Sequence, residues 1–163
     1  MSSPTQVARP KRQSLVMVEN VRNILESKNS AIWSVTPDTT VYDALALMAE
    51  KGIGALLVME QGRLVGVVSE RDYARKVALQ GKHSRDTQVS EIMTSPAVTV
   101  ALDHTVEQCM EMMTDRRIRH LPVVVGSSVL GIVSIGDLVK TIISAQAHTI
   151  DQLSNYISGD YPG

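Results

Sequence analysis

The stretch GVVSERD, Gly66–Asp72, occurs a second time in the chain as GIVSIGD, Gly131–Asp137. Both copies follow an apolar run and have the same order: glycine, two apolar residues, serine, two further residues and aspartate. The same separation relates Val35–Asp72 to Val100–Asp137 without a gap. A chain that repeats itself over such a length is built from two copies of one supersecondary unit, and missing that repeat would misassign the fold.

Each copy predicts the element order β-α-β-β-α. Apolar residues recur at helical spacing after the Asp-x-Thr segments that begin at Asp38 and Asp103, in which both Asp and Thr are good N-cap types, and Gly52 is a suitable C-cap for the first helix. A further helix is expected after each serine of the repeated motif. Continuous Val, Ile and Leu runs predict strands covered by helices rather than strands with one wet face. The expected extended segments are 33–36, 55–59 and 64–69 in the first copy, and 98–101, 121–125 and 129–134 in the second.

The sequence around the repeats predicts two further features. VRNIL from Val21 resembles VSEIM from Val89 at a slightly larger separation, so the first copy carries about three extra residues in its opening loop. Downstream of Leu138, apolar residues continue at helical spacing and predict a long amphipathic C-terminal helix that docks on the module or on another chain. Its expected apolar stripe contains Val139, Ile142, Ile143, Ile150, Leu153 and Ile157.

The predicted fold class is mixed α/β (α+β), with two β-α-β-β-α repeats and a C-terminal helix. The predicted organisation is a flexible tail at 1–14, a first domain at 15–82, a second at 83–145, and the C-terminal helix and tail at 146–163. Units of about 60 residues bury little surface alone, so the repeats are expected to pack together as one pseudo-twofold module.

Composition argues against several classes of protein. The net charge is −1, and aromatic residues make up 3% of the chain, so neither the basic surplus nor the stacking platforms of a nucleic-acid binder are present. The sequence has no run of about 18 apolar residues and no secretory apolar segment, so no membrane partner is expected. One cysteine, Cys109, excludes an intrachain disulfide and fits a small buried residue in a reducing, cytoplasmic setting.

The residues that could perform catalysis do not form a recognisable set. The four histidines are scattered, so we expect no metal site, and no nucleophile–base pair or Walker loop is visible. The sequence therefore predicts a protein that is not an enzyme and has no catalytic cofactor.

The repeated serine and aspartate allow two interpretations. In the first they form a capping box, in which serine and the acidic residue three positions later stabilise the start of a helix. In the second, the same geometry serves a ligand, because a helix N-terminus offers backbone N–H groups and a first-turn carboxylate can accept hydrogen bonds from a ribose diol.

The duplicated β-α-β-β-α unit with this motif resembles a tandem pair of CBS domains, also called a Bateman module. The resemblance covers about residues 16–145 and implies that adenine nucleotides, AMP, ADP, ATP or possibly both halves of NAD, bind in clefts between the two repeats. For the first cleft it implies Ser69, Arg71 and Asp72, with Trp33, Ile53 and Gly54 near the base. For the second it implies Ser134, Gly136 and Asp137, with Pro96, Val98, Ile118 and Arg119.

The two copies differ immediately before a strand. Arg119 and His120 stand in the second copy where Gly54 and Ala55 stand in the first. The resemblance implies that this position faces the phosphate of the nucleotide whose ribose lies on the other repeat. Arg119 and His120 would then serve the Asp72 cleft, which would hold the more highly charged end of a ligand. The alternative is a solvated helix end, where cations are favoured by the helix dipole.

The function predicted from these observations is a stand-alone sensor that binds an adenosine-containing ligand and changes its conformation or partner binding. A homodimer is expected, with an unknown regulated protein as a further partner. The main alternative is a structural dimerisation or interaction module with no physiological nucleotide, and a lesser one is nucleotide-dependent catalysis.

Overall fold

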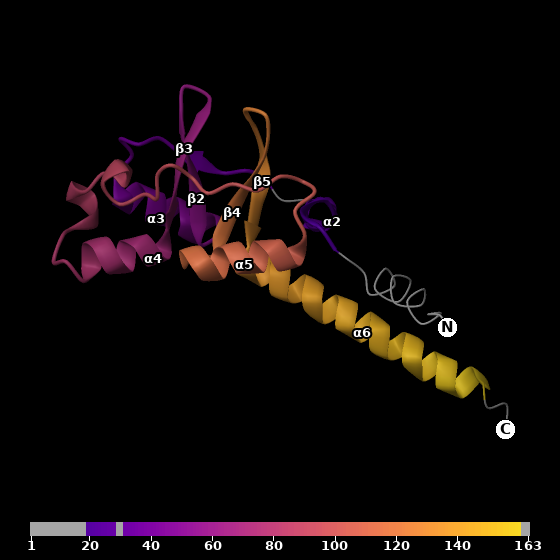
Figure 1. Ribbon diagram of the computed structural model, residues 1–163. Coiled ribbons are helices and arrows are strands. Elements are labelled where there is room, and N and C mark those ends of the chain that lie inside the picture. Colours follow the sequence, from indigo (N-terminus) through magenta and orange to yellow (C-terminus); the bar gives the residue numbers. More distant parts are fainter. Residues whose placement is uncertain (1–18, 29–30, 161–163) are drawn as a thin grey trace, which may run out of the picture. The chain divides into compact units, whose positions relative to one another are not determined.

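A computed structural model describes residues 19–28 and 31–160, without the side chains of residues 156–160. The predicted tail at 1–14 and the Ile157 side chain lie outside the described residues. The mixed α/β fold, with its repeated element order and a long C-terminal helix, is confirmed (Figure 1). The elements are α2 (Val21–Lys28), β1 (Ser34–Val35), α3 (Val41–Lys51), β2 (Ala55–Glu60), β3 (Arg63–Ser69), α4 (Glu70–Tyr73), the π-helical turn η1 (Ala74–Ala78), the 3₁₀ turns η2 (Ser84–Asp86) and η3 (Val89–Glu91), α5 (Val106–Arg116), β4 (His120–Val125), β5 (Ser128–Ser134) and α6 (Ile135–Asp160).

The described chain forms two compact units, and each unit takes residues from both sequence copies. Within the described residues, unit 1 contains 19–28, 103–119 and 133–160. Unit 2 contains 31–102 and 120–132. The compact units therefore cut across the two sequence segments, 15–82 and 83–145, that the repeat predicted as domains.

Each copy begins with an opening segment, VRNIL from Val21 or VSEIM from Val89. An exchange of these two segments between the copies explains the division into units. In unit 1 the Val21 N–H donates to the carbonyl of His104 (2.9 Å), and the Val106 N–H donates to the carbonyl of Glu19 (3.0 Å). In unit 2 the matching bonds run from Val41 N–H to the carbonyl of Thr87 and from Val89 N–H to that of Thr39, both 2.8 Å. The segment that precedes each copy in the sequence thus packs against the helix start of the other copy.

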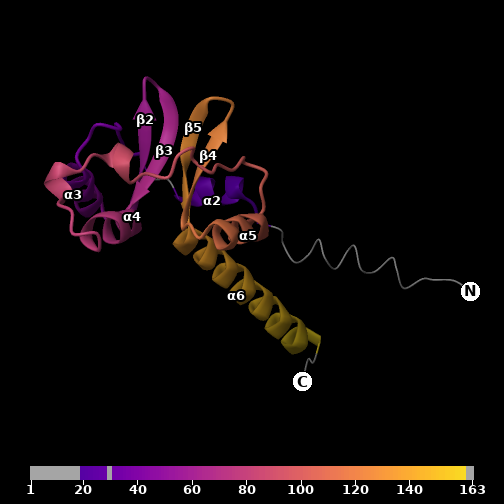
Figure 2. The same ribbon diagram turned by 60° about the vertical axis from the view of Figure 1, so that its left-hand side comes forward.

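The core of unit 2 lies between its sheet and α3. The sheet has the order β1-β2-β3, with β1 parallel and β3 antiparallel to β2. Met48 of α3, Leu56 and Val58 of β2 and Ile92 after η3 are buried in one aliphatic cluster. The other side of the β2–β3 hairpin packs against Val129 and Ile132 of β5, so the hairpins β2–β3 and β4–β5 lie side by side (Figure 2).

The opening strand of the second copy is shorter than predicted. The expected segment 98–101 has only one ladder contact, in which Val100 bridges to Val123 in parallel. Its N–H donates to the carbonyl of Pro122 (2.9 Å), and its carbonyl accepts from Val124 N–H (3.0 Å). These two bonds have the same parallel pattern as the pairing of β1 with β2, but they do not continue into a strand.

Of the two candidate N-cap residues in each Asp-x-Thr segment, the threonine is the cap and the aspartate, Asp38 or Asp103, is not. The hydroxyls of Thr40 and Thr105 each accept the N–H three residues on, at the starts of α3 and α5. Gly52 ends α3 with φ +66°, as predicted, and its counterpart Arg117 ends α5 with φ +56°. Arginine there holds a left-handed conformation that normally favours glycine.

Unit 1 consists of α2, α5 and α6. Figures 1 and 2 show the second half of α6 extending beyond α2 and α5. Leu138, in the first turn, is fully buried, whereas Ile143, Ile150 and Leu153 are 58–62% exposed. The predicted C-terminal helix is therefore present and 26 residues long, and Val139, Ile143, Ile150 and Leu153 of its predicted apolar stripe are exposed, whereas Ile142 is half-buried. Among the described helices, none has the length and apolar character needed to cross a lipid bilayer.

Candidate functional site

The first copy of the motif forms a complete capping box at the start of α4. The Ser69 hydroxyl accepts from Asp72 N–H (3.2 Å), and Asp72 Oδ2 accepts from both the Ser69 N–H (2.9 Å) and its hydroxyl (3.0 Å). The Lys76 ammonium lies 3.6 Å from Asp72 Oδ1 and donates to the carbonyl of Ile92 (2.9 Å). One carboxylate oxygen is thus used by the cap, and the other faces a cation of the following π-helical turn η1.

Gly54, one of the predicted base-side residues of this copy, lies beside the start of α4. Glu70 N–H donates to the Gly54 carbonyl (3.0 Å), which ties the strand start to the helix start. A Cβ added to Gly54 would lie 3.2 Å from Glu70 Oε1 and 3.7 Å from His120 Nε2. The structure therefore brings His120 to the first copy's strand start, together with a carboxylate, Glu70, that sequence reasoning did not include.

Glycine at the start of the motif has a steric cause. A Cβ at Gly66 would lie 2.8 Å from the Thr94 carbonyl oxygen and 2.9 Å from Met93 Sδ. The backbones are this close because Val67 and Thr94 exchange hydrogen bonds of 3.1 and 2.9 Å. Glycine at position 66 is therefore explained by the close approach of the segment around Thr94, and no ligand is needed to explain it.

The remaining first-copy residues differ in their surroundings. Trp33 is 36% exposed, and the Lys51 ammonium lies 4.1 Å from its ring centroid, a cation–π distance. Ile53 is half-buried beside the core cluster of unit 2. Arg71 is half-buried in the first turn of α4.

The second copy repeats the capping geometry at the start of α6. Asp137 Oδ2 accepts from Ser134 N–H (2.8 Å), and the Ser134 hydroxyl accepts from Asp137 N–H (3.1 Å). The Ile135 N–H donates to the Arg119 carbonyl (2.8 Å), which matches the bond between Glu70 and Gly54 in the first copy.

The cation beside the second aspartate comes from a different place. The Lys28 ammonium, at the end of α2, donates to Asp137 Oδ2 at 2.8 Å. Burial by itself raises the pKa of Asp137, but the Lys28 hydrogen bond, the Ser134 N–H and the Lys28 charge outweigh it and hold the pKa below its usual value. Lys28 was absent from the predicted site, because the repeat alone does not reveal that α2 packs against the second copy.

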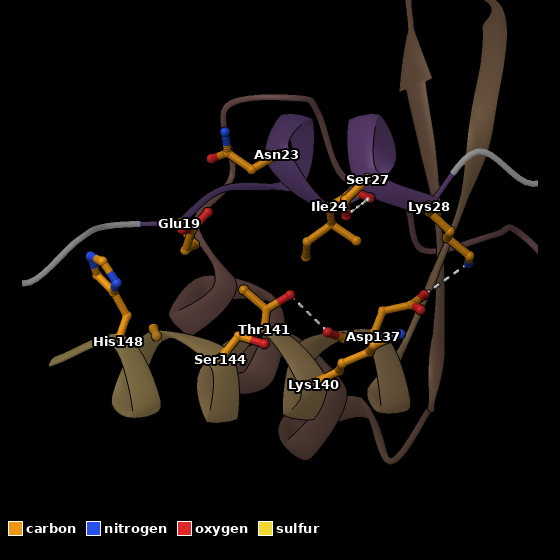
Figure 3. A pocket seen from close by; sticks show the side chains of 11 residues that line it. Glu19, Asn23, Ile24, Ser27, Lys28, Asp137, Lys140, Thr141, Ser144 and His148 are labelled. Carbon is orange, nitrogen blue, oxygen red and sulfur yellow. Dashed lines mark hydrogen bonds and ion pairs between the residues drawn. The ribbon is translucent and has the colours of Figure 1, made fainter. Parts of the chain in front are cut away.

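A groove of about 550 Å³ lies between α2 and α6, within the usual range of ligand pockets (Figure 3). Lys28 and Asp137 face each other at one end, and Glu19 and His148 lie at the other. The lining residues are Glu19, Asn23, Ile24, Ser27, Lys28, Asp137, Lys140, Thr141, Ser144, Ala145 and His148.

The groove has a sequence origin in the repeat. In the alignment of the two copies, Thr141 corresponds to Lys76. Ile24, in the segment VRNIL, corresponds to Ile92 in the segment VSEIM. Lys76 bridges to the carbonyl of Ile92, whereas the shorter Thr141 donates to the carbonyl of Asp137 on its own helix (2.9 Å). The second copy therefore lacks the lysine bridge that spans the corresponding position in the first.

Other predicted site residues are divided between the compact units. Arg119 belongs to unit 1, and the Ser69–Asp72 motif to unit 2. Pro96 and Val98 belong to unit 2, whereas Ile118, Gly136 and Asp137 belong to unit 1. The assignment of these residues to shared clefts stays a prediction.

Two further sequence expectations concern reactivity. Cys109 is fully buried, as predicted, and burial raises the pKa of its thiol. Within residues 19–28 and 31–160, no group of three or more His, Cys, Asp or Glu side chains is placed to hold a metal ion.

Comparison with known proteins gives consistent matches over most of the chain. The family model described as CBS domain matches twice, at residues 21–79 and 89–144. A mitochondrial CBS domain-containing protein of Arabidopsis thaliana, CBSX3, is 37% identical over 98% of this chain and 82% of its own length. A solved protein with CBS domains from Burkholderia ambifaria is 49% identical, with a TM-score of 0.74 over 77% of this chain and 94% of that chain.

One solved neighbour carries ligands. The CBS domain pair of protein MJ0100 is in complex with 5′-methylthioadenosine and S-adenosyl-L-methionine. It is 25% identical, with a TM-score of 0.69 over 78% of this chain and 98% of that chain.

Proposed function

The chain belongs to the CBS-domain family, and from this premise we propose that its CBS pair is a regulatory module that senses an adenosine-containing ligand. AMP, ADP, ATP or NAD would bind through the two Ser-x-x-Asp motifs and favour one conformation or partner complex over another. The observation that carries this proposal is the presence of two carboxylates, Asp72 and Asp137, each fixed by a capping box in the first turn of a helix. Such a carboxylate has lone pairs left to accept ribose hydroxyls.

The ligand class is supported by the neighbour MJ0100, whose two bound molecules both contain adenosine. NAD would place one nucleoside at each motif, whereas a mononucleotide would use either. In the first site we assign Ser69, Arg71 and Asp72 to the ribose side, and Trp33, Ile53 and Gly54 to the base side. In the second we assign Ser134, Gly136 and Asp137 to the ribose side, and Pro96, Val98 and Ile118 to the base side.

Arg119 and His120 are proposed to bind the phosphate of the ligand at Asp72. The position of the His120 ring beside Gly54 supports this assignment for the histidine. Glu70, which reaches the same position, repels phosphate and limits the charge that the site accepts. Arg119→Ala should weaken AMP binding roughly tenfold while leaving adenosine nearly unchanged, because a charge-assisted bond is lost only with phosphate present. Equal losses for adenosine and AMP would remove Arg119 from the phosphate site.

Calorimetry with AMP, ADP, ATP and NAD tests the ribose assignment. Asp72→Ala and Asp137→Ala should each weaken binding roughly tenfold or more, since hydrogen bonds to a charged acceptor are lost. Asp103→Ala, which removes an exposed carboxylate outside the motifs, is the matched control and should bind as the wild type does. Melting temperatures of all three variants separate lost binding from lost folding.

The alternative, an interaction module without a nucleotide, makes a different prediction. The purified chain would then release no adenosine-containing molecule on denaturation, as judged by mass spectrometry, and the four nucleotides would give no heat in calorimetry. Released nucleotide that is found unhydrolysed would argue against nucleotide-dependent catalysis. A reducing, cytoplasmic setting is proposed from the single buried cysteine.

We also propose that the chain forms a homodimer through α6. The support is the exposed stripe of Val139, Ile143, Ile150 and Leu153 on one side of this helix. Helical spacing places these residues opposite the groove-lining residues Thr141 and His148. Light scattering of Ile150→Asp should show a loss of dimer, whereas Asn155→Asp on the other side should not. A wild-type monomer at micromolar concentration would contradict the proposal.

A further inference from the structure

The ion pair between Lys28 and Asp137 connects the last residue of α2 to the first turn of α6. Its atoms are 2.8 Å apart, and the two side chains keep 28% and 21% of their exposure. Asp137 Oδ2 also accepts the Ser134 N–H, so this oxygen already takes two hydrogen bonds. A ribose diol that uses both carboxylate oxygens would need the place that Lys28 holds.

The two ends of α2 are held differently. At the N-terminal end, two backbone hydrogen bonds link the chain to the start of α5, and Val21 is fully buried. At the C-terminal end, Lys28 reaches Asp137 across the end of the groove (Figure 3). The helix has only eight residues, and Val21 and Ile24 are its buried ones. A helix of this length depends on such tertiary contacts for its stability.

In the first copy the lysine beside the aspartate is held differently. Lys76 approaches Asp72 Oδ1 at 3.6 Å, beyond the hydrogen-bond distance of Lys28, and is tied to the Ile92 carbonyl. The position of Lys28 is taken in the first copy by Pro96, which has no side-chain donor.

We propose that Lys28 competes with ribose for Asp137, so that a nucleoside binding at the second motif displaces it and releases the C-terminal end of α2. This inference rests on the proposed function. It assigns Lys28 as a residue that sets the preference between the two motifs, with the first motif occupied before the second. It also makes α2 the element that reports occupation of the second motif.

The test isolates the second motif in an Asp72→Ala background and uses adenosine, which has no phosphate. Lys28→Met keeps the aliphatic stem and removes the charge, so adenosine affinity should rise roughly threefold to fivefold, the upper part of the range expected for losing a partly exposed ion-pair competitor. AMP should gain by the same factor. Lys28→Arg keeps the ion pair, so its adenosine affinity should equal that of the Asp72→Ala protein in which Lys28 is unchanged.

The matched control is Lys76→Met in an Asp137→Ala background, where adenosine affinity should change less than about twofold. Hydrogen exchange gives a readout independent of affinity: the amides of residues 25–28 should exchange faster in Lys28→Met, and also when adenosine saturates the Lys28 protein.

Three results would overturn the inference. One is unchanged or weaker adenosine binding in Lys28→Met. Another is weaker AMP binding with unchanged adenosine, which would make Lys28 a phosphate ligand instead. The third is unchanged exchange at the end of α2 on adenosine binding. If neither adenosine nor AMP binds the wild type or any variant, the proposed function fails instead. That outcome is distinguishable from the three results above, because each of them requires that binding can be measured.

Discussion

The two copies of the motif share two capping hydrogen bonds at their aspartates, but the lysines beside those aspartates have different origins. Asp72 faces Lys76 of its own helical segment, whereas Asp137 is bound by Lys28 from a helix about a hundred residues away in the chain. The capping box is local, so sequence repetition reproduces it. The counter-charge is not local, so it depends on which opening segment packs against which copy.

The same contrast extends along the helices that follow the motifs. In the first copy α4 is followed by a π-helical turn, and Lys76 bridges to the carbonyl of Ile92. In the second copy α6 is one helix of 26 residues, and Thr141 leaves a groove beside α2. Two motifs with the same capping geometry thus have different surroundings in the two copies.

Replacement of Gly66 by alanine should give the largest change in stability. The new methyl group would meet the Thr94 carbonyl oxygen at 2.8 Å, and a backbone atom can move only if the exchanged segment shifts. We expect a loss of about 2–3 kcal/mol in the free energy of unfolding, measured by urea denaturation.

Gly54→Ala is the control for this prediction, since its nearest neighbour is the mobile end of Glu70 at 3.2 Å. Its cost should stay below about 1 kcal/mol. Gly131→Ala, at the equivalent place in the second copy, shows whether both copies need the same close approach. A Gly66→Ala protein as stable as Gly54→Ala would contradict the steric explanation.

The elements of the fold were largely predictable because their causes are local. Apolar runs and turn residues placed β1 to β5 to within one residue, whereas the expected strand 98–101 forms only a single bridge, and Gly52 was correctly identified as the cap of α3. The exchange of opening segments was not predictable, because VRNIL and VSEIM resemble each other and fit the same environment. The extra residues between α2 and β1 were visible as a changed separation, but length alone does not say where the segment packs.

The candidate site was predictable only in part for the same reason. Ser69 with Asp72 and Ser134 with Asp137 meet within one turn, so their geometry followed from spacing. Lys28 was missed because its partner is distant in sequence, and Glu70 because first-turn acidic residues are common caps. A signal for Lys28 did exist: Pro96 occupies its aligned position, so the two copies differ in charge there.

The Lys28–Asp137 pair should make a moderate contribution to stability that disappears in acid. Asp137→Asn should lower the free energy of unfolding by about 1 kcal/mol near pH 7, as expected of a partly exposed ion pair. Because the folded-state pKa of Asp137 is lowered, this contribution is complete above the unfolded-state pKa and is lost as pH falls through the folded value. The gap between wild type and variant should therefore narrow below about pH 4.

A double-mutant cycle separates the pair from the cap. If Lys28 and Asp137 interact directly, the loss in Lys28→Met plus Asp137→Asn should be smaller than the sum of the single losses, by about 0.5–1 kcal/mol at neutral pH. Urea unfolding at pH 7 and at pH 3 measures the loss in each variant and the coupling energy between Lys28 and Asp137. Additive losses at pH 7 would show that the ion pair contributes nothing to stability.

The smallest expected effect concerns the two helix ends. Gly52 and Arg117 occupy equivalent positions with φ +66° and +56°, and their N–H groups donate to Met48 and Met113. Arginine in this conformation is strained by about 1–2 kcal/mol, and glycine relieves that strain but makes the unfolded chain more flexible. Arg117→Gly should therefore raise the free energy of unfolding by about 0.5 kcal/mol. Arg117→Ala removes the charge and keeps the strain, so it should be no more stable than the wild type.

The reverse change, Gly52→Arg, should cost about 1 kcal/mol, because open space around Gly52 leaves only backbone strain. If Arg117→Gly is no more stable than Arg117→Ala, the left-handed cap of α5 carries no strain, and the two helix ends are equivalent in energy as well as in geometry.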